Sequence, residues 1–307
     1  MASMSDDVIA TLPIRLWNGH KGTFGTVLVV AGQATMIGAP CFVAVGALRI
    51  GCGLVRLALP PEILSACLGI VPSAIGVPRT ADHAQITAEI DHQTVIAAGP
   101  GLGLGSAEES LIHSFLQIDR PLVIDGDGLT HLSKLGTTAL KDQHSNCKIP
   151  RQAPLILTPH PGEYARLAST WGTAPLRDDA SDGERKECAK ELAIATQSIV
   201  VLKGHGTVVS DGVESWTCTV GNPALAIPGS GDVLTGIIAG LLSQGLRGHE
   251  AAILGVHLHG LAGDRWAEQR PFGMLALELA ALIPEVARNF SLHRTLTALQ
   301  TSVVQLQ

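Results

Sequence analysis

Residues 221–236 read G-N-P-A-L-A-I-P-G-S-G-D-V-L-T-G, a polar, glycine-rich turn that leads directly into an apolar segment. Apolar residues recur with helical spacing after the turn, which predicts a buried helix that ends at Gly245. The first N–H groups of such a helix have no partner within it, and the positive end of its dipole faces the turn. This arrangement is typical of sites that bind phosphate.

Four residues of the turn are suited to phosphate chemistry. Gly229 and Gly231 allow the backbone to approach an anion closely, and Ser230 is a residue type that caps helices. Asp232 adds a carboxylate that could take the proton of a hydroxyl group as a phosphoryl group arrives. The alternative is that Asp232 only stabilises the positive end of the helix.

The composition indicates a globular α/β protein with a small-molecule partner. The 307 residues are 46% hydrophobic and 16% charged, which is enough for a sizeable core. Aromatic residues make up 3% and glycine numbers 34, so the core consists mainly of Ala, Val, Leu and Ile. A net charge of −6 without a basic cluster argues against nucleic acid or an anionic membrane as partner. We expect a cytoplasmic protein, because no secretory leader or membrane-spanning apolar run is apparent.

The N-terminal part of the chain alternates between strand-like and helix-like segments. Residues 26–31 form a short β-branched run closed by Gly32, a helix is expected over about 37–50, and a second strand over 54–59. This order is typical of parallel strands joined by helices, in which ligands gather at the carboxyl ends of the strands.

Three later apolar runs each end in a pair of polar side chains. These are 121–128 with Asp125 and Asp127, 154–163 with His160 and Glu163, and 198–207 with Lys203 and Thr207. Because the carboxyl ends of parallel strands lie along one edge of a sheet, we expect these side chains to converge on one crevice. Each pair taken alone is typical of a loop or a helix cap.

A glycine-rich stretch over 99–106, G-P-G-L-G-L-G-S, follows a strand predicted over 94–98. It does not match a dinucleotide-binding fingerprint, because Leu104 or Ser106 stands where the third glycine is required. We interpret the stretch as a wall of the substrate site or as a tight turn between strand and helix.

The C-terminal part is expected to add a hairpin and helices. The predicted elements are strands at 207–211 and 214–219 and helices at 249–269 and 274–289. His257 and His259 lie two residues apart and so on different helix faces, and we interpret both as structural. We expect one domain over residues 1–307, with an ordered core from about 14 to 290 and flexible tails.

Together these segments resemble the ADP- or ATP-dependent NAD(P)H-hydrate dehydratases, which have the ribokinase-like fold. The resemblance covers nearly the whole chain and is carried by H-K-G-T-F-G at 20–25, G-P-G-L-G at 99–103, L-T-P-H-P-G-E at 157–163, V-L-K-G-H-G-T at 201–207, and 221–236. It implies an α/β fold, a three-layer α/β/α sandwich around a mostly parallel central sheet. It also implies repair of damaged NADH and NADPH: a nucleotide phosphorylates the hydroxyl group of the S epimer of the hydrate, and loss of phosphate restores NAD(P)H.

The resemblance also implies roles for individual residues. Those expected to bind the hydrate are Ala39, Gly101, His160 and Asp232. Those expected to bind the nucleotide are Lys203, Gly204, His205, Gly206, Thr207 and Gly231, beside an anion hole formed by Gly229, Ser230 and Gly231. Asp232 matches the catalytic aspartate of the family, and Lys203 is expected to hold the phosphates as a point charge. For His160 the alternative is a cap of its loop.

The expected cofactor is Mg²⁺, with ADP or ATP as co-substrate and with the metal ligands left open. ADP is the donor that the bacterial and archaeal members imply, although both nucleotides present the same adenosine and a terminal phosphoryl group. The expected partners are the hydrates NADHX and NADPHX, the nucleotide, and a separate epimerase upstream, since one dehydratase domain fills 307 residues. Apolar helices near the C-terminus also favour a homo-oligomer.

Two departures from the family pattern leave alternatives open. Residues 124–130 read I-D-G-D-G-L-T where many members have L-D-A-D-A-L-N, so Thr130 stands in place of the Asn. Pro228 removes a backbone N–H just before the anion hole. The alternatives are another ribokinase-like small-molecule kinase, which stops at the phosphorylated product, and a nucleotide-binding protein of the same fold without catalytic activity.

Overall fold

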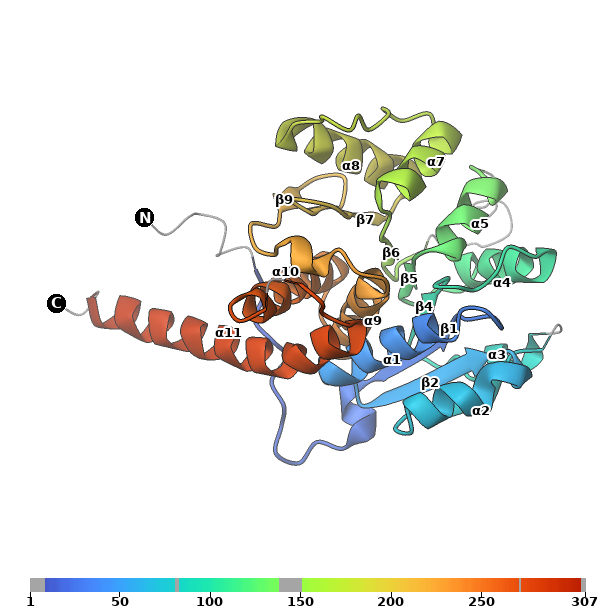
Figure 1. Ribbon diagram of the computed structural model, residues 1–307, viewed down its shortest axis with the longest axis horizontal. Coiled ribbons are helices and arrows are strands. Elements are labelled where there is room, and N and C mark those ends of the chain that lie inside the picture. The colour runs from blue at the N-terminus through green and yellow to red at the C-terminus, as the bar shows by residue number, and fades with distance from the viewer. Residues whose placement is uncertain (1–8, 81–82, 138–150, 271, 305–307) are drawn as a thin grey trace.

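The computed structural model describes residues 9–80, 83–137, 151–270 and 272–304. Within them a single sheet has the strand order β3-β2-β1-β4-β5-β6-β7-β8-β9 (Figure 1). The strands are β1 Thr26–Val30, β2 Leu54–Leu59, β3 Ile75–Pro78, β4 Thr94–Ala98, β5 Leu122–Ile124, β6 Leu155–Leu157, β7 Ile199–Leu202, β8 Val208–Ser210 and β9 Ser215–Thr217. Neighbours from β3 to β7 are parallel, whereas β8 and β9 form an antiparallel hairpin after β7. The mostly parallel sheet and the hairpin are as the sequence predicted.

Both faces of the sheet are covered, so the central strands are buried along their length. In β1, Val27 and Val29 belong to one hydrophobic core while Leu28 and Val30 belong to the other, because successive side chains of a strand point to opposite faces. The helices on the first face are α1 Gly38–Arg49, α2 Pro61–Ile70, α9 Ser230–Ser243, α10 Gly248–Ala267 and α11 Ala276–Val304. Those on the second face are α3 Ala84–Ala88, α4 Ser106–Leu116, α5 Asp127–Leu135, α7 Pro161–Trp171 and α8 Asp182–Thr196. The predicted three-layer α/β/α sandwich is therefore confirmed.

Helix α9, which follows the glycine-rich turn, packs almost backbone to backbone against α1. A Cβ atom added at Gly236 would lie 2.0 Å from the Val43 carbonyl oxygen, and one added at Gly46 would lie 2.4 Å from the Val233 carbonyl oxygen. Neither position admits a side chain without moving a helix. This close approach fixes the start of α9, and thus the turn, at the carboxyl edge of the sheet.

The two ends of the described chain differ from expectation. Helix α11 continues to Val304, well past the expected end of the ordered core, and extends beyond the rest of the molecule in Figure 1. Ile9, expected in a flexible tail, is buried in the core, and Arg294 donates to its carbonyl oxygen. The extent of the single domain over 1–307 stays a prediction. Among the described residues, no helix combines the length and apolar character needed to cross a membrane.

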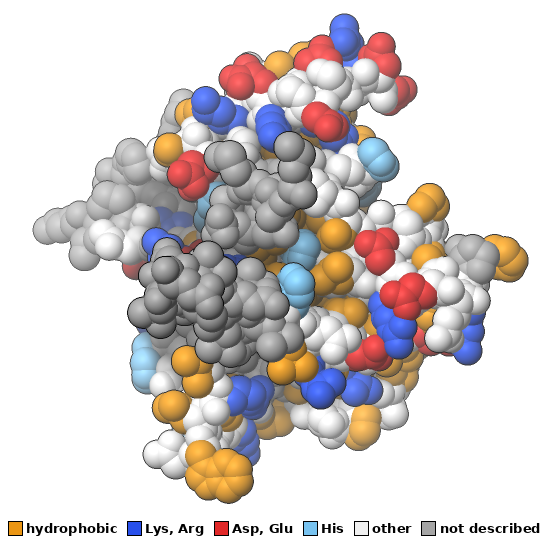
Figure 2. Space-filling model, turned by 90° about the vertical axis from the view of Figure 1, so that its left-hand side faces the viewer, with side chains coloured by type: hydrophobic (Ala, Val, Ile, Leu, Met, Phe, Trp, Pro, Cys, Tyr) orange, Lys and Arg blue, Asp and Glu red, His pale blue; other side chains and the backbone are white. Residues whose placement is uncertain are grey.

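Charge is mixed on the visible surface. Over the described part of the face in Figure 2, Lys and Arg side chains and Asp and Glu side chains are both present. This agrees with the balance of 21 basic and 27 acidic residues in the sequence. A field of one sign, of the kind that recruits nucleic acid, does not develop over that part of the face.

Candidate functional site

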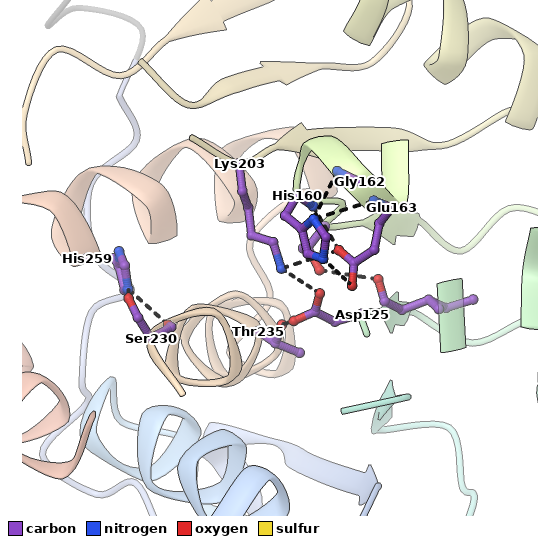
Figure 3. A network of polar contacts seen from close by, with 10 residues as sticks. Asp125, His160, Gly162, Glu163, Lys203, Ser230, Thr235 and His259 are labelled. Carbon is purple, nitrogen blue, oxygen red and sulfur yellow. Dashed lines mark hydrogen bonds and ion pairs between the residues drawn. The ribbon is translucent and has the colours of Figure 1, made fainter. Parts of the chain in front are cut away.

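Four charged side chains meet at the carboxyl edge of the sheet, as Figure 3 shows for three of them. Asp125 follows β5, Glu163 lies in the first turn of α7 after β6, Lys203 follows β7, and Asp232 lies in the first turn of α9. We call Asp125, Glu163, Lys203 and Asp232 the charge cluster. Their elements are distant in sequence, but parallel strands bring their carboxyl ends to one edge.

An ion pair between Lys203 and Asp125 lies at the centre of the charge cluster. The Lys203 Nζ is 2.7 Å from Asp125 Oδ1, and the Thr235 hydroxyl of α9 donates to Asp125 Oδ2 at 2.8 Å (Figure 3). Asp125 is only 2% exposed. Its burial opposes ionisation, but Lys203, Thr235 and Thr158 outweigh that cost and lower the pKa of the carboxyl below its usual value. The pair fixes the ammonium relative to α9.

The other two carboxyl groups of the cluster hold their protons more tightly than usual. Burial, then the negative charge of Asp125, raises the pKa of Asp232 to about 7, and Lys203 only partly offsets this. Burial also raises the pKa of Glu163 to about 7, with Lys203 lowering it and Asp125 raising it. The Lys203 Nζ lies 3.9 Å from Glu163 Oε2. Three carboxyl groups thus face one ammonium, so at neutral pH part of them remain protonated.

The expected anion hole begins at Gly229, the last residue of the turn, where φ is +86°. Gly229 is the N-cap of α9 and no side chain caps the helix there, so the predicted capping role of Ser230 is wrong. Ser230 is instead the first helical residue, and its hydroxyl lies 3.1 Å from His259 Nε2. A Cβ atom at Gly231 would lie 3.2 Å from Lys203 Nζ, so the structure brings Lys203 and Gly231 together.

Sequence reasoning did not place His259 at the site, but the structure places it against Ser230 at the start of α9. Its Nε2 lies 3.0 Å from the Ser230 carbonyl oxygen as well as near the hydroxyl (Figure 3). Burial lowers the pKa of His259 to about 4, so the ring is neutral at pH 7 and Nε2 can donate to that carbonyl. His257, by contrast, is buried between the rings of Trp216 and Phe290 and is structural, as predicted. No local signal separates the two histidines, because the partner of His259 lies 29 residues away.

His160 caps helix α7. Its Nδ1 accepts from the Gly162 N–H at 3.0 Å, while Glu163 Oε2 accepts from the His160 N–H at 2.8 Å (Figure 3). The capping alternative is therefore confirmed. The His160 side chain is nevertheless 53% exposed, with Nε2 3.4 Å from Glu163 Oε1 beside the charge cluster. Contact of His160 with the hydrate stays a prediction.

The expected nucleotide segment 203–207 forms a tight loop after β7. Gly204 and Gly206 have positive φ angles of 139° and 63°, and the Thr207 hydroxyl donates to the Gly204 carbonyl at 3.0 Å. His205 is exposed. Of this segment only Lys203 belongs to the charge cluster, and the convergence of Thr207 on the crevice and the binding roles of residues 203–207 stay predictions.

A glycine-rich loop packs against the backbone of Asp125 and is expected to form a second wall of the site beside the charge cluster. Residues 99–105, which we call the glycine loop, pass over the start of α1. A Cβ atom at Gly101, where φ is +57°, would lie 2.7 Å from Met36 Cβ and 3.4 Å from Ala39 Cβ. The structure therefore brings together Ala39 and Gly101, two residues expected to bind the same ligand. Asp127 was expected in the crevice, but it accepts from the Gly103 N–H at 2.9 Å instead.

Comparison with known proteins assigns the chain to a family. A family model described as NAD(P)H-hydrate dehydratase matches residues 27–285. The chain belongs to this family. It is 33% identical over 292 residues to the ADP-dependent (S)-NAD(P)H-hydrate dehydratase of Bacillus subtilis, covering 93% of this chain and 97% of the relative. It is also 40% identical over 294 residues to the bifunctional NAD(P)H-hydrate repair enzyme Nnr of Moorella thermoacetica, covering 91% of this chain but about half, 52%, of the relative's length.

Solved structures of relatives agree with the dehydratase family and its fold. The ADP/ATP-dependent NAD(P)H-hydrate dehydratase from B. subtilis, co-crystallized with ATP/Mg²⁺, has a TM-score of 0.77 at 30% identity, over 93% of this chain and 97% of that chain. A ribokinase-like superfamily protein from Enterococcus faecalis has a TM-score of 0.75 at 25% identity, over 94% and 95%. The ribokinase-like fold expected from the sequence is confirmed.

Proposed function

We propose that this dehydratase converts the S epimer of NADH or NADPH hydrate to NAD(P)H with consumption of ADP or ATP. The observation that carries the proposal is the position of Asp232, a partly buried carboxyl with a pKa of about 7 at the positive end of α9, beside Lys203. A general base works best when its pKa lies near the working pH. The relatives named above act on the same hydrate, which supports this choice of substrate.

In the proposed reaction, Asp232 takes the proton of the hydrate hydroxyl as that oxygen attacks the terminal phosphoryl group, and AMP leaves from ADP, or ADP from ATP. The backbone N–H groups of residues 229–232 and the Lys203 ammonium stabilise the charge that develops on the phosphoryl oxygens. Departure of inorganic phosphate from the phosphorylated carbon, with loss of a proton from the neighbouring ring carbon to water or to the phosphate, then forms the double bond of the dihydronicotinamide. The nitrogen lone pair of the ring can supply the electrons for this elimination, so Asp232 is needed chiefly for the first step.

Mg²⁺ on the nucleotide fits the charges of this site. The charge cluster already holds three carboxyl groups against one ammonium, so nucleotide phosphates add negative charge that a divalent cation offsets. Among the described residues, no group of three His, Cys, Asp or Glu side chains could hold a metal by itself. The phosphates and water would therefore supply most ligands, with Glu163 or Asp232 adding one or two carboxylate contacts.

The runner-up is a small-molecule kinase of the same fold, which would stop at a phosphorylated product. One assay separates the two: purified protein with NADH hydrate, Mg²⁺ and either ADP or ATP, followed by absorbance of the reduced nicotinamide. A dehydratase restores the absorbance in step with nucleotide consumption. Nucleotide consumption with flat absorbance would favour the kinase, and no consumption would favour a binding protein. The upstream epimerase and the homo-oligomer stay predictions.

A further inference from the structure

The glycine loop presents Gly101 at the tip of a tight turn. The Leu102 N–H donates to the Gly99 carbonyl at 3.0 Å, with Pro100 and Gly101 between them. Proline followed by a residue of positive φ is the sequence of a type II turn. Among the described residues, the Gly101 N–H donates to no acceptor. The turn thus offers one backbone donor beside Ala39 and Met36.

One end of the glycine loop is tied to the sheet. The Gly99 N–H donates to the Val30 carbonyl of β1 at 3.0 Å, and the Pro100 carbonyl accepts from the Gly32 N–H at 3.0 Å. These bonds fix the side of the turn that precedes Gly101. The side of the turn that follows Gly101 must be held by other contacts.

Helix α5 fixes the other end by binding both polar backbone groups of Gly103. The Asp127 carboxylate accepts from the Gly103 N–H at 2.9 Å, and His131 Nε2 lies 2.8 Å from the Gly103 carbonyl oxygen. Because a carbonyl can only accept, Nε2 carries the proton in this contact. The His131 side chain is 0% exposed, and its Nδ1 faces Glu109 Oε2 at 3.8 Å. A buried imidazole with one bonded partner holds its rotamer firmly, because other rotamers would leave that carbonyl unpaired.

Asp127 and Asp125 stand on either side of Gly126, whose φ is +56°. This turn at the end of β5 sends Asp125 to Lys203 and Asp127 to Gly103. A single strand end therefore holds the ammonium of the charge cluster and the far end of the glycine loop. The two walls of the site are kept in a fixed relation by three consecutive residues.

We propose that Asp127 and His131 are positioning residues for the hydrate, holding Gly103 so that the Gly101 N–H faces the substrate. This inference rests on the proposed function, in which Gly101 lines the hydrate site. A merely structural helix start would explain the acidic residue in the first turn of α5. It would not explain why the carboxylate and a buried imidazole of that helix bind the two backbone groups of one loop residue.

The test compares three variants of the full chain. Asp127→Ala removes the acceptor of the Gly103 N–H, whereas Asp127→Asn keeps a carbonyl oxygen at the same position. Ser133→Ala is the control, because it removes a hydrogen bond that α5 makes to Thr170 and not to the glycine loop. We expect Asp127→Ala to raise KM for the hydrate about 10-fold and to leave KM for ADP unchanged, since one buried hydrogen bond is lost. Asp127→Asn and Ser133→Ala should stay near wild type. Should Asp127→Ala fail to fold, Asp127→Ser, with too short a side chain to reach Gly103, takes its place.

Two further measurements separate this inference from the proposed function. Calorimetry gives the affinity for the hydrate without nucleotide, and hydrogen exchange reports the Gly103 amide directly. Faster exchange in Asp127→Ala together with weaker hydrate binding supports the positioning role, even if wild type restores no absorbance and the dehydratase proposal fails. Unchanged hydrate affinity in Asp127→Ala overturns the role. Equal weakening of hydrate and ADP, or the same weakening in Ser133→Ala, also overturns it.

Discussion

The charge cluster and the glycine loop, which we propose as two walls of one site, are built by different means. In the charge cluster, ionisable side chains from four elements meet at the positive end of α9. In the glycine loop, backbone groups and close packing around Gly101 define the surface. Charge suits the phosphates of a nucleotide, whereas an uncharged ring is recognised by shape and single hydrogen bonds. Substitutions in the two walls should therefore affect different kinetic constants.

The largest effect is expected in the charge cluster from Asp232→Asn. The amide nearly preserves the shape of the side chain but cannot accept the hydroxyl proton, so turnover should fall roughly 10²- to 10⁴-fold. The melting temperature should not fall, because a carboxyl group that is costly to ionise is replaced by a neutral group. Turnover close to wild type, measured beside nucleotide affinity, would reject Asp232 as the base.

Lys203→Ala, in the charge cluster, should lower both the nucleotide affinity and the stability of the protein, and the two losses can be measured separately. Without the ammonium, nucleotide affinity measured by calorimetry should fall more than hydrate affinity. The buried Asp125 carboxylate also loses its partner, so the free energy of unfolding should drop by about 3–5 kcal/mol.

The double variant Lys203→Ala/Asp125→Asn provides the control for that loss. Replacing the unpaired carboxylate with an amide should restore much of the stability without restoring nucleotide binding. Recovery of nucleotide affinity in the double variant would show that Lys203 acts on Asp125 alone.

Gly101→Ala changes the glycine loop and should weaken binding of the hydrate rather than of the nucleotide. A Cβ atom there meets Met36 Cβ at 2.7 Å and is strained at a φ of +57°, so the turn must shift. We expect KM for the hydrate to rise about 10-fold with KM for ADP unchanged, equivalent to roughly 1–2 kcal/mol of strain. A rise in the ADP constant instead would mean that the glycine loop serves the nucleotide.

The smallest expected effect is the contribution of Asp232 and Glu163 to the pH dependence of stability. The folded-state pKa of Asp232 and of Glu163 is about 7, above the values of 3.8 and 4.5 usual for these carboxyl groups in an unfolded chain. The folded protein therefore binds these protons more tightly, and this stabilisation is complete below about pH 4 and lost as the pH rises through 7. The free energy of unfolding of the ligand-free wild type should decline across this range relative to that of Asp232→Asn, a comparison that cancels the opposite contribution of His259, which both proteins share. Over the same range, turnover should rise as Asp232 loses its proton.

Local patterns account for most of the agreement between the sequence and the structure. Alternation of short β-branched runs with helices predicts a parallel sheet, and that prediction in turn placed His160, Glu163 and Lys203 at one edge. The turn at 221–236 predicts a helix start at which Asp232 faces an anion. The motifs of the same segments sufficed to identify the family, which the comparison confirmed.

The sequence by itself determined the elements, their order and the residue types at the strand ends, because hydrophobic period, glycine and proline act within a few residues. Only the tertiary structure decided which polar groups pair. Ser230 was expected to cap α9 but bonds to His259, and Asp127 was expected in the crevice but binds Gly103. These partners are 29 and 24 residues apart. A side chain's hydrogen bonds depend on distances of a few tenths of an ångström between packed elements, which local sequence does not encode.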